Sequence, residues 1–242
     1  MKTKALHLLV VAALIVSIHP AAVTAAEGDL AVADELMIEA GKLLREERPD
    51  EAEAKVARAL EMRKALLEKD HPDIARSYHL LARIKLSKGE HAVAESYGKR
   101  AWGIRERAFG KNHQEVAASL VFLGRLALFT ARYAEAGEFL TAALEVCSRV
   151  YGMGGEDTAP CLALLGRLAS ARGNYGEAQE YMKKALEIRE KNLDIDHPDI
   201  VQSLGMLAAL YLETGKYAEA EALSRRVIEI REKTQGKDHP SL

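Results

Sequence analysis

A histidine followed by proline and preceded by aspartate recurs along this chain, and these residue types could do chemistry. The sequence "DHPDI" spans Asp70–Ile74 and again Asp196–Ile200, and "DHPSL" begins at Asp238. Imidazole and carboxylate groups bind transition metals or exchange protons as an acid–base pair. Both roles require several of these side chains to meet in space, so the elements that hold them decide the question.

The histidines mark a regular internal repeat. His71, His113, His197 and His239 are separated by steps of 42 or 84 residues, and Gly155 stands at the remaining step. We call equivalent positions of successive units a column. Other columns also hold similar residues at this 42-residue step, for example the alanines Ala94, Ala136, Ala178 and Ala220. The sequence therefore predicts units over residues 29–70, 71–112, 113–154, 155–196 and 197–238, with a truncated sixth start at 239–242.

Each unit contains two amphipathic helical patterns. In the last complete unit, Leu204, Leu207 and Tyr211 follow helical spacing, and Leu223 and Ile230 do the same in a second segment. Gly215 lies between the two segments, where a left-handed residue ends a helix. One such hairpin cannot bury its apolar faces alone, so neighbouring hairpins must stack. The expected fold is all-α, a right-handed superhelical solenoid of about five helix-turn-helix repeats.

The repeat also gives the histidines a structural interpretation. Pro72 and Pro198 suit the first turn of a helix, and Asp73 and Asp199 follow near the positive end of its dipole. Corners of stacked hairpins lie at least about 10 Å apart, one helix diameter, whereas metal–ligand bonds are about 2 Å long. We therefore interpret the histidines as corner residues, and we expect no metal site and no cofactor.

The segment "LAALYLETGKYAEAEALSRRVIEI" resembles the tetratricopeptide repeat. The period of 42 residues exceeds the usual length of about 34, and it resembles the variant found in kinesin light chains. The resemblance covers about Asp29 to Leu242 and implies a scaffold that holds peptides or partner domains in a concave groove. The matching positions are Ala208, Tyr211, Gly215, Tyr217, Ala220 and Val227.

The resemblance also implies which residues face the groove, because the first helix of each hairpin lines the concave side in this family. The positions where kinesin light chains carry asparagines hold His79, Val121, Ala163 and Gly205 here. The candidate partner-binding residues are Arg76, His79, Arg83, Val121, Arg125, Phe129, Arg167 and Gln202.

Three of these arginines occupy one column in successive units. Arg83, Arg125 and Arg167 should form a row with rungs about 10 Å apart. Guanidinium groups bind carboxylates in a two-pronged manner, so the column favours an acidic segment or a free C-terminal carboxylate, with Val121 and Phe129 as an apolar floor. In the alternative, each arginine pairs with an acid of its own array or is solvated.

Several other residues have structural interpretations. The "IRE" segments Ile104–Glu106, Ile188–Glu190 and Ile230–Glu232 place arginine near the end of a second helix, where it complements the dipole and covers apolar surface. Trp102 stands in a core column. Cys147 and Cys161 flank a turn, so they can form a disulfide if their α-carbons come within about 7 Å, or they are two small buried residues.

The first residues predict an exported protein. "MKTK" precedes the apolar run "ALHLLVVAALIVSI", which has the length of a signal-peptide core, and small residues follow up to Ala25 and Ala26. We expect a signal peptide at 1–26, no membrane span after its cleavage, and a periplasmic or secreted protein. An uncleaved membrane anchor is the alternative.

Charge and motifs exclude other classes of function. Loss of Lys2 and Lys4 would leave 32 basic and 36 acidic side chains, which gives no basic footprint for nucleic acid. The sequence has no Gly-rich phosphate loop, HExxH, paired-cysteine zinc spacing or GxSxG, so no catalytic residue is assigned and an enzyme is not expected. We expect a protein-interaction scaffold. Alternatively, the chain assembles into a homo-oligomer through the ends of the array, especially the C-terminal end.

Overall fold

The computed structural model describes residues 20–235, and within that range it is built of helices alone. It contains ten α-helices and one short 3-10 helix, η1, with no strand. The bounds are α2 (Pro20–Arg45), α3 (Pro49–Leu66), α4 (Pro72–Ser87), α5 (His91–Phe109), α6 (Gln114–Phe129), α7 (Tyr133–Tyr151), η1 (Glu156–Thr158), α8 (Ala159–Ala171), α9 (Tyr175–Asn192), α10 (Pro198–Glu213) and α11 (Tyr217–Gln235).

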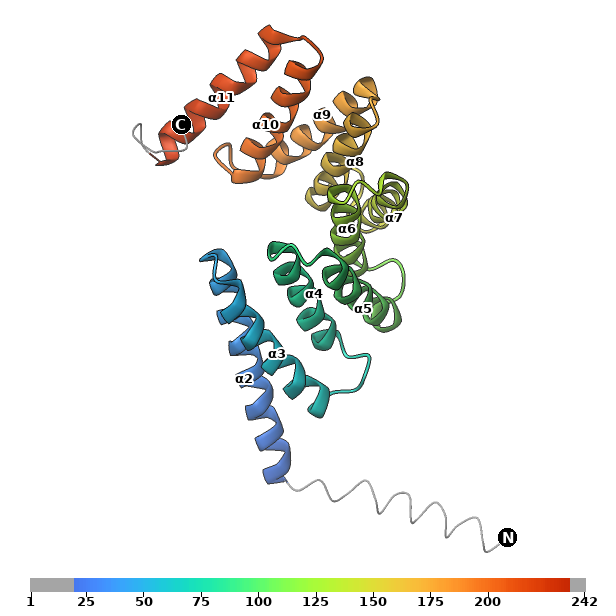
Figure 1. Ribbon diagram of the computed structural model, residues 1–242, viewed down its shortest axis with the longest axis vertical. Coiled ribbons are helices and arrows are strands. Elements are labelled where there is room, and N and C mark those ends of the chain that lie inside the picture. The colour runs from blue at the N-terminus through green and yellow to red at the C-terminus, as the bar shows by residue number, and fades with distance from the viewer. Residues whose placement is uncertain (1–19, 236–242) are drawn as a thin grey trace, which may run out of the picture.

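Consecutive helices pair into hairpins, and the hairpins stack in chain order (Figure 1). The pairs are α2 with α3, α4 with α5, α6 with α7, α8 with α9, and α10 with α11. Each second helix also packs against the first helix of the following hairpin. The chain is therefore an all-α repeat solenoid, as the 42-residue step predicts.

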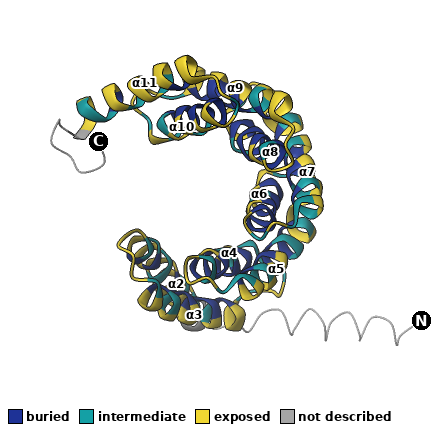
Figure 2. Ribbon diagram, turned by 45° about the horizontal axis from the view of Figure 1, so that its top comes forward, coloured by how far each residue is buried: buried dark blue, intermediate teal, exposed yellow. Residues whose placement is uncertain are grey.

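The stack curls, with one set of helices inside and the other outside. Figure 2 shows α4, α6, α8 and α10 along the inner face of the curl and α3, α5, α7, α9 and α11 along its outer face. The first helices of these hairpins thus line the concave side, which is where the groove residues were expected.

The helices of a hairpin approach closely because the second helix carries alanine at the contact. Ala94, Ala136, Ala178 and Ala220 are each at most 1% exposed. A larger side chain at these positions would hold the helices apart or force neighbouring side chains out of their rotamers. The alanine column therefore sets the spacing within the hairpins.

The turn inside each hairpin has the same backbone geometry in all five. A left-handed residue follows the first helix: Gly89, Gly173 and Gly215 at φ between 74 and 78°, with Ala131 at 57° and Glu47 at 58°. The next residue donates its N–H to a carbonyl five positions back, as Glu90 does to Lys85 at 2.9 Å. This closes the helix with a Schellman-type bond.

The histidines at the corners cap the first helices. The Nδ1 atoms of His71, His113 and His197 each accept a hydrogen bond, at 3.2 Å, from the backbone N–H two residues later. Each imidazole thereby satisfies one of the free N–H groups at a helix start. The corner interpretation is confirmed, and the capping bond adds the physical reason for the histidine. His239 lies outside the described residues.

Two predicted segments fall partly or wholly beyond the described range. Most of the expected signal peptide (1–26) and the sixth start (239–242) lie outside residues 20–235. The first helix starts at Pro20, earlier than the predicted unit boundary at Asp29, because the alanine-rich stretch before it has high helix propensity. Among the described helices, none combines the length and apolar character that crossing a bilayer requires.

Candidate partner-binding groove

A column of three arginines lies along the inner helices. Arg83 on α4, Arg125 on α6 and Arg167 on α8 are all exposed. Within residues 26–234, none of the three forms an ion pair with an acidic side chain. The predicted row of guanidinium groups is therefore present in register, and the alternative that each pairs with an acid of its own array finds no support in these contacts.

A cavity of about 360 Å³ opens between α4, α6 and the start of α8. Four of the predicted groove residues line it: His79, Arg83, Val121 and Arg125. The remaining lining residues are Gln114, Ala117, Ala118, Phe122, Cys147, Tyr151, Asp157 and Pro160. The lining thus combines apolar residues with two arginines and one acidic residue, Asp157.

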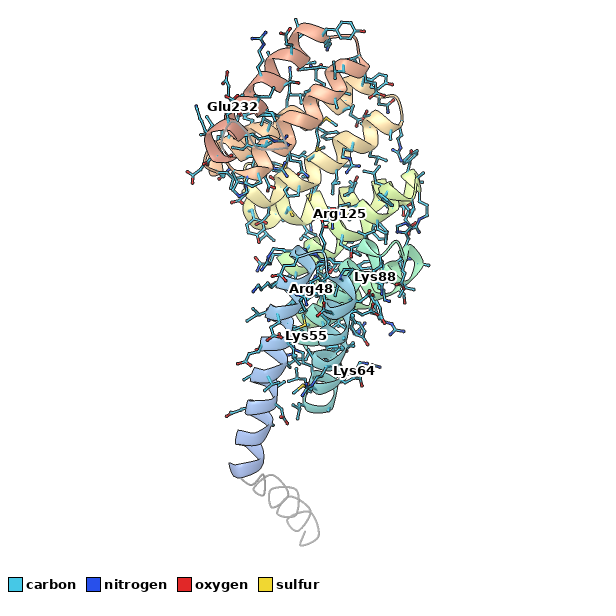
Figure 3. The ribbon with its side chains drawn as sticks, turned by 60° about the vertical axis from the view of Figure 1, so that its left-hand side comes forward. Arg48, Lys55, Lys64, Lys88, Arg125 and Glu232 are labelled. Carbon is cyan, nitrogen blue, oxygen red and sulfur yellow. The ribbon has the colours of Figure 1, made fainter. Side chains whose placement is uncertain are left out.

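A second hollow adjoins the first along the inner face. Its volume is about 270 Å³, and it is lined by Leu44, Leu86, Ser87, Arg83 and Arg125. The two arginines therefore belong to both hollows, which joins them into one continuous groove. Arg125 lies near the middle of the array (Figure 3).

The arginine column concentrates positive charge. Arg125 is exposed, but protein atoms around its guanidinium displace part of the surrounding water, and this desolvation, followed by repulsion from Arg83 and Arg167, lowers its pKa below the usual value. Arg125 also lies 6.0 Å above the ring of Phe122, so a cation–π contact offsets part of this cost. Like charges brought together without an acidic partner create a potential that attracts carboxylates.

His79 contributes no charge to the groove at neutral pH. Burial, followed by repulsion from the nearby Arg105, Arg83 and Arg125, lowers its pKa to about 3. Its ring packs edge-on against Phe122 at a centroid distance of 5.4 Å, and its Nδ1 has no hydrogen-bond partner among the described residues. His79 therefore lines the cavity as a neutral aromatic ring whose Nδ1 atom has no hydrogen-bond partner among the described residues.

Four predicted site residues line neither of these two hollows, and one of them is Arg167, which stands in the arginine column on α8. Arg76 is exposed and pairs with Asp73 at 3.1 Å. Phe129 does not line either hollow: it packs against His91 at 5.1 Å, and the aromatic floor comes from Phe122 instead. Gln202 lines a separate hollow of about 530 Å³ in the last hairpin. Phe129 is exposed at the end of α6, one helical turn beyond Arg125 and beside the hairpin turn.

Buried arginines join neighbouring hairpins, and the sequence prediction missed their role. Arg105 on α5 donates to the hydroxyl of Ser119 on α6 at 2.9 Å and to the carbonyl of Glu115 at 3.2 Å. Its guanidinium also pairs with the Glu115 carboxylate at 2.7 Å. The prediction of a structural role for this arginine agrees with the contacts, but the guanidinium is buried between units rather than exposed at a helix end.

The same arrangement recurs one unit before and two units after. Arg63 donates to Ser77 at 2.8 Å, and Arg189 donates to Ser203 at 2.6 Å. We call Arg63–Ser77, Arg105–Ser119 and Arg189–Ser203 the arginine–serine pairs. The signal for them was present in the sequence, because both members repeat at the 42-residue step and always stand 14 residues apart.

The two cysteines lie together in the core. Cys147 on α7 and Cys161 on α8 are 3% and 0% exposed, and their sulfur atoms are 3.9 Å apart. Trp102 packs beside them as a core residue, as its column predicts. Among the described residues, no group of three or more His, Cys, Asp or Glu side chains could hold a metal ion.

The geometry of stacked hairpins agrees with the family to which the sequence is matched. The tetratricopeptide repeat profile matches residues 37–107, 115–191 and 170–233, which is well over half of the chain. The chain therefore belongs to the tetratricopeptide repeat family, whose members are protein-interaction scaffolds and are generally non-enzymatic.

Solved structures with the same fold include kinesin-light-chain-like repeat proteins. A Podosopora anserina protein of kinesin light chain type, with nearly identical TPR-like repeats, is 24% identical, with a TM-score of 0.65 over 84% of this chain and 96% of that one. BtubC from P. vanneervenii is 24% identical, with a TM-score of 0.62 over 89% of this chain and 94% of that one. These similarities show the fold.

A third similar structure is a Rap protein complexed with competence and sporulation factor. It is 17% identical, with a TM-score of 0.71, and the match covers 81% of this chain and 53% of the Rap chain. No curated protein sequence matches the chain significantly. These comparisons show the fold and the family.

Proposed function

We propose that this chain is an exported scaffold that binds an acidic protein segment, or a free C-terminal carboxylate, in its concave groove. The observation that carries the proposal is the arginine column, whose three guanidinium groups are exposed and have no acidic partner among the described residues. The similar Rap protein was solved in complex with competence and sporulation factor, which supports partner binding as a role for this fold.

The spacing of the column suggests the form of the ligand. Successive inner helices are about 10 Å apart, and an extended chain advances about 3.3 Å per residue. A bound segment would therefore meet one arginine about every third residue. Aspartate or glutamate at that spacing, or a terminal carboxylate at one rung, would give charge-assisted hydrogen bonds to the guanidinium groups.

The apolar floor would select among acidic segments. Val121 and Phe122 line the cavity beside Arg83 and Arg125, and His79 is neutral. A segment with an apolar side chain between its acidic residues could bury that side chain against this floor while its carboxylates contact the arginines. Purely electrostatic attraction to the column would lack this preference.

A matched pair of variants tests the groove. Fluorescent peptides with acidic residues at every third position would be titrated against the parent, Arg83→Ala/Arg125→Ala/Arg167→Ala, and the control Arg58→Ala/Arg100→Ala/Arg225→Ala. The control removes the same charge from exposed positions on α3, α5 and α11. We expect affinity to fall by about tenfold or more in the first variant and to change little in the control, because two or more charged hydrogen bonds are lost. Equal losses in both variants would reject the groove.

The partner itself can be captured with cross-linking. Affinity capture of the native chain from its own compartment, followed by mapping of cross-links, would place the partner on the protein. Cross-links that concentrate around α4, α6 and α8 are expected. Cross-links confined to the outer helices would contradict the proposal.

Export is tested at the N-terminus. The expected mature protein begins after Ala25 or Ala26 and is recovered outside the cytoplasm. N-terminal sequencing of the protein from fractionated cells measures both properties. An intact Met1 on cytoplasmic protein would overturn this part of the proposal and leave the groove untouched.

Self-association through the last hairpin is a second candidate function. Ile228 on α11 is 43% exposed, whereas in the same column Leu60 and Leu186 are buried and Trp102 and Leu144 are half-buried. An apolar side of this kind suits a second copy of the chain. Sedimentation equilibrium should then show dimers that Ile228→Glu dissociates, and a monomer at high concentration would count against it.

A further inference from the structure

The four interfaces between neighbouring hairpins use one pair of columns. Three of them contain the arginine–serine pairs, with the arginine on the second helix and the serine 14 residues later on the next first helix. The fourth interface, between α7 and α8, has Cys147 in the arginine column and Cys161 in the serine column. The spacing of 14 residues is kept. At this interface alone among the four, both the arginine and the serine are replaced, and both are replaced by cysteine.

The arginine at each of the other three interfaces binds both the serine hydroxyl and a backbone carbonyl of the next hairpin. Arg63 and Arg189 donate to the carbonyls of Asp73 and Asp199 as well as to the serine hydroxyls. At the α7–α8 interface the matching carbonyl belongs to Asp157, and its contact is with the Cys161 sulfur at 4.0 Å. This interface thus lacks the charged hydrogen bonds that fasten the other three.

A pair of thiols at these positions can fasten the interface in another way. The Cys147 and Cys161 sulfurs are 3.9 Å apart, and each side chain is buried by the helix that carries the other. A disulfide requires a sulfur–sulfur distance of about 2 Å, so the two sulfurs need to approach by about 2 Å. Rotation of two short side chains that already face each other covers much of that distance.

We propose that Cys147 and Cys161 form an intrachain disulfide that takes the place of the arginine–serine pair and links the third hairpin covalently to the fourth. The oxidant would be a disulfide of a small thiol or of a protein. The Cys147 thiolate attacks one sulfur of that disulfide. A mixed disulfide forms between Cys147 and the attacked sulfur, and the other sulfur leaves as a thiolate, which takes up a proton to give the first released thiol. Cys161 then loses its proton and attacks the Cys147 sulfur, which releases the second thiol. Two thiols of this chain are oxidised and one disulfide of the oxidant is reduced.

The groove gives the first attacking thiol its access. Cys147 lines the cavity of about 360 Å³, whereas Cys161 does not. The Cys161 S–H donates toward the Cys147 sulfur, and this contact holds the pKa of Cys147 below its ordinary value. The same contact, together with burial, raises the pKa of Cys161. Cys147 is therefore the better nucleophile and Cys161 the resolving thiol.

The link would act at the wall of the groove. Cys147 lies among the lining residues that include Tyr151 and Asp157, so the bond fixes the edge of α7 against the start of α8. The reduced interface is held by apolar packing of Leu140 on α7 with Leu164 and Leu165 on α8. The inference does not depend on the nature of the groove's ligand, because it concerns only the stability of this interface.

Thiol counting on the purified full-length chain tests the proposal. The chain is incubated with glutathione disulfide or with a reductant, denatured, alkylated and digested, and its peptides are identified by mass spectrometry. We expect the oxidised chain to lose both free thiols and to yield one linked peptide pair that joins Cys147 to Cys161. Its melting temperature should rise by about 5–10 °C over that of the reduced chain, because the bond closes a short loop.

A variant that restores the common pattern provides the control. Cys147→Arg/Cys161→Ser places an arginine and a serine in the same columns as at the other three interfaces. We expect this variant to fold with the helix content of the parent and to melt at one temperature with or without glutathione disulfide. Thiols that stay free in the oxidised parent, or that link only different chains, would overturn the proposal. An equal rise in melting temperature in parent and variant would overturn the stabilising role.

Discussion

At the scale of single residues, burial decides what an arginine does in this protein. Arg105 and Arg107 are two positions apart on α5, yet Arg105 is 5% exposed and contacts the next hairpin, whereas Arg107 is exposed and pairs with Asp70. A buried cation that loses its partners, or a buried set of acceptors that loses its cation, costs far more than a surface ion pair. The two residues therefore form a natural comparison.

We expect Arg105→Ala to destabilise the array by about 3 kcal/mol, because it leaves the Glu115 carboxylate and carbonyl without their charged donor at the interface. Arg107→Ala should cost less than about 1 kcal/mol, because its ion pair is exposed to solvent. Urea unfolding followed by the fluorescence of Trp102, which lies on the same helix, measures both values. Similar losses for the two variants would mean that the arginine–serine pair does not fasten the interface.

His79 gives the groove a dependence on pH that its arginines lack. Its pKa is lowered from 6.5 to about 3 in the folded chain, first by burial and then by nearby arginines. The unfolded chain therefore binds this proton more readily, so stability is fully present above pH 6.5 and is lost as the pH falls toward 3. The loss should approach about 1.4 kcal/mol per pH unit within that window.

The variant His79→Leu isolates this contribution. It removes the titrating group while keeping an apolar side chain against Phe122, so its stability should fall less steeply than that of the parent between pH 6 and pH 4. Urea midpoints measured across this range give the difference between the two slopes, and other acidic groups contribute equally to both proteins. Parallel curves would show that His79 does not titrate in this window.

At the scale of elements, the turn within each hairpin shows how one backbone geometry accepts different residues. Gly89 has φ of 75°, and Ala131 occupies the same place with φ of 57°. A side chain in the left-handed region costs about 1 kcal/mol relative to glycine. A Cβ at Gly89 would meet no heavy atom within 4 Å, so the cost there is conformational rather than steric.

Opposite substitutions at these two turns should have opposite effects. Ala131→Gly is expected to stabilise the protein by about 0.5–1 kcal/mol, and Gly89→Ala to destabilise it by about the same amount, because only the second introduces a strained residue. Thermal and urea unfolding of the two variants and the parent measure the changes. Destabilisation by both would show that Ala131 has a packing role that outweighs its backbone strain.

The elements were readable from the sequence because each depends on local signals. Apolar residues at helical spacing recur at every 42-residue step, and proline at helix starts and glycine at the turns recur in several units, so an ambiguous unit can be interpreted from the others. The start of α2 was less predictable, because the alanine-rich residues near Pro20 resemble the end of a signal peptide as much as a helix. Both interpretations rest on the same small residues.

The site was only partly predictable, for a physical reason. The arginine column could be placed from the repeat alone, because Arg83, Arg125 and Arg167 share one helix face. The burial of Arg105 and Arg189 could not be predicted from their position alone, since a charged residue near a helix end is usually solvated. Only the repeated spacing of 14 residues to a serine indicates it. The contact between Phe129 and His91 could not be predicted from the repeat, because it depends on how the hairpin turn packs.

At the scale of the whole molecule, each hairpin contacts mainly the hairpins directly before and after it. The extensive contacts join helices within one hairpin or in adjacent hairpins, such as α3 with α4 and α9 with α10. Its stability should therefore be a sum of hairpin and interface terms. An array of this kind tolerates the loss of one whole repeat but not a shift of register.

This can be tested by deleting one repeat within a helix. Removal of residues 122–163 joins the first part of α6 to the last part of α8 in the same column, and it keeps Arg105, Glu115 and Ser119 together. We expect this shorter chain to keep the helical fraction of the parent in circular dichroism and to melt cooperatively. Removal of residues 122–161 instead inserts two residues into the joined helix and turns its apolar face by about 200° away from α9.

The second deletion is expected to lose helical signal beyond the removed residues and to expose apolar surface to a fluorescent dye, because its rear half can no longer stack. Both chains have nearly the same length and composition, and both lack Cys147, so register is the main difference between them. Equal folding of the two deletions would show that the hairpins fold independently of their neighbours, and the 42-residue step would then not be what holds the groove together.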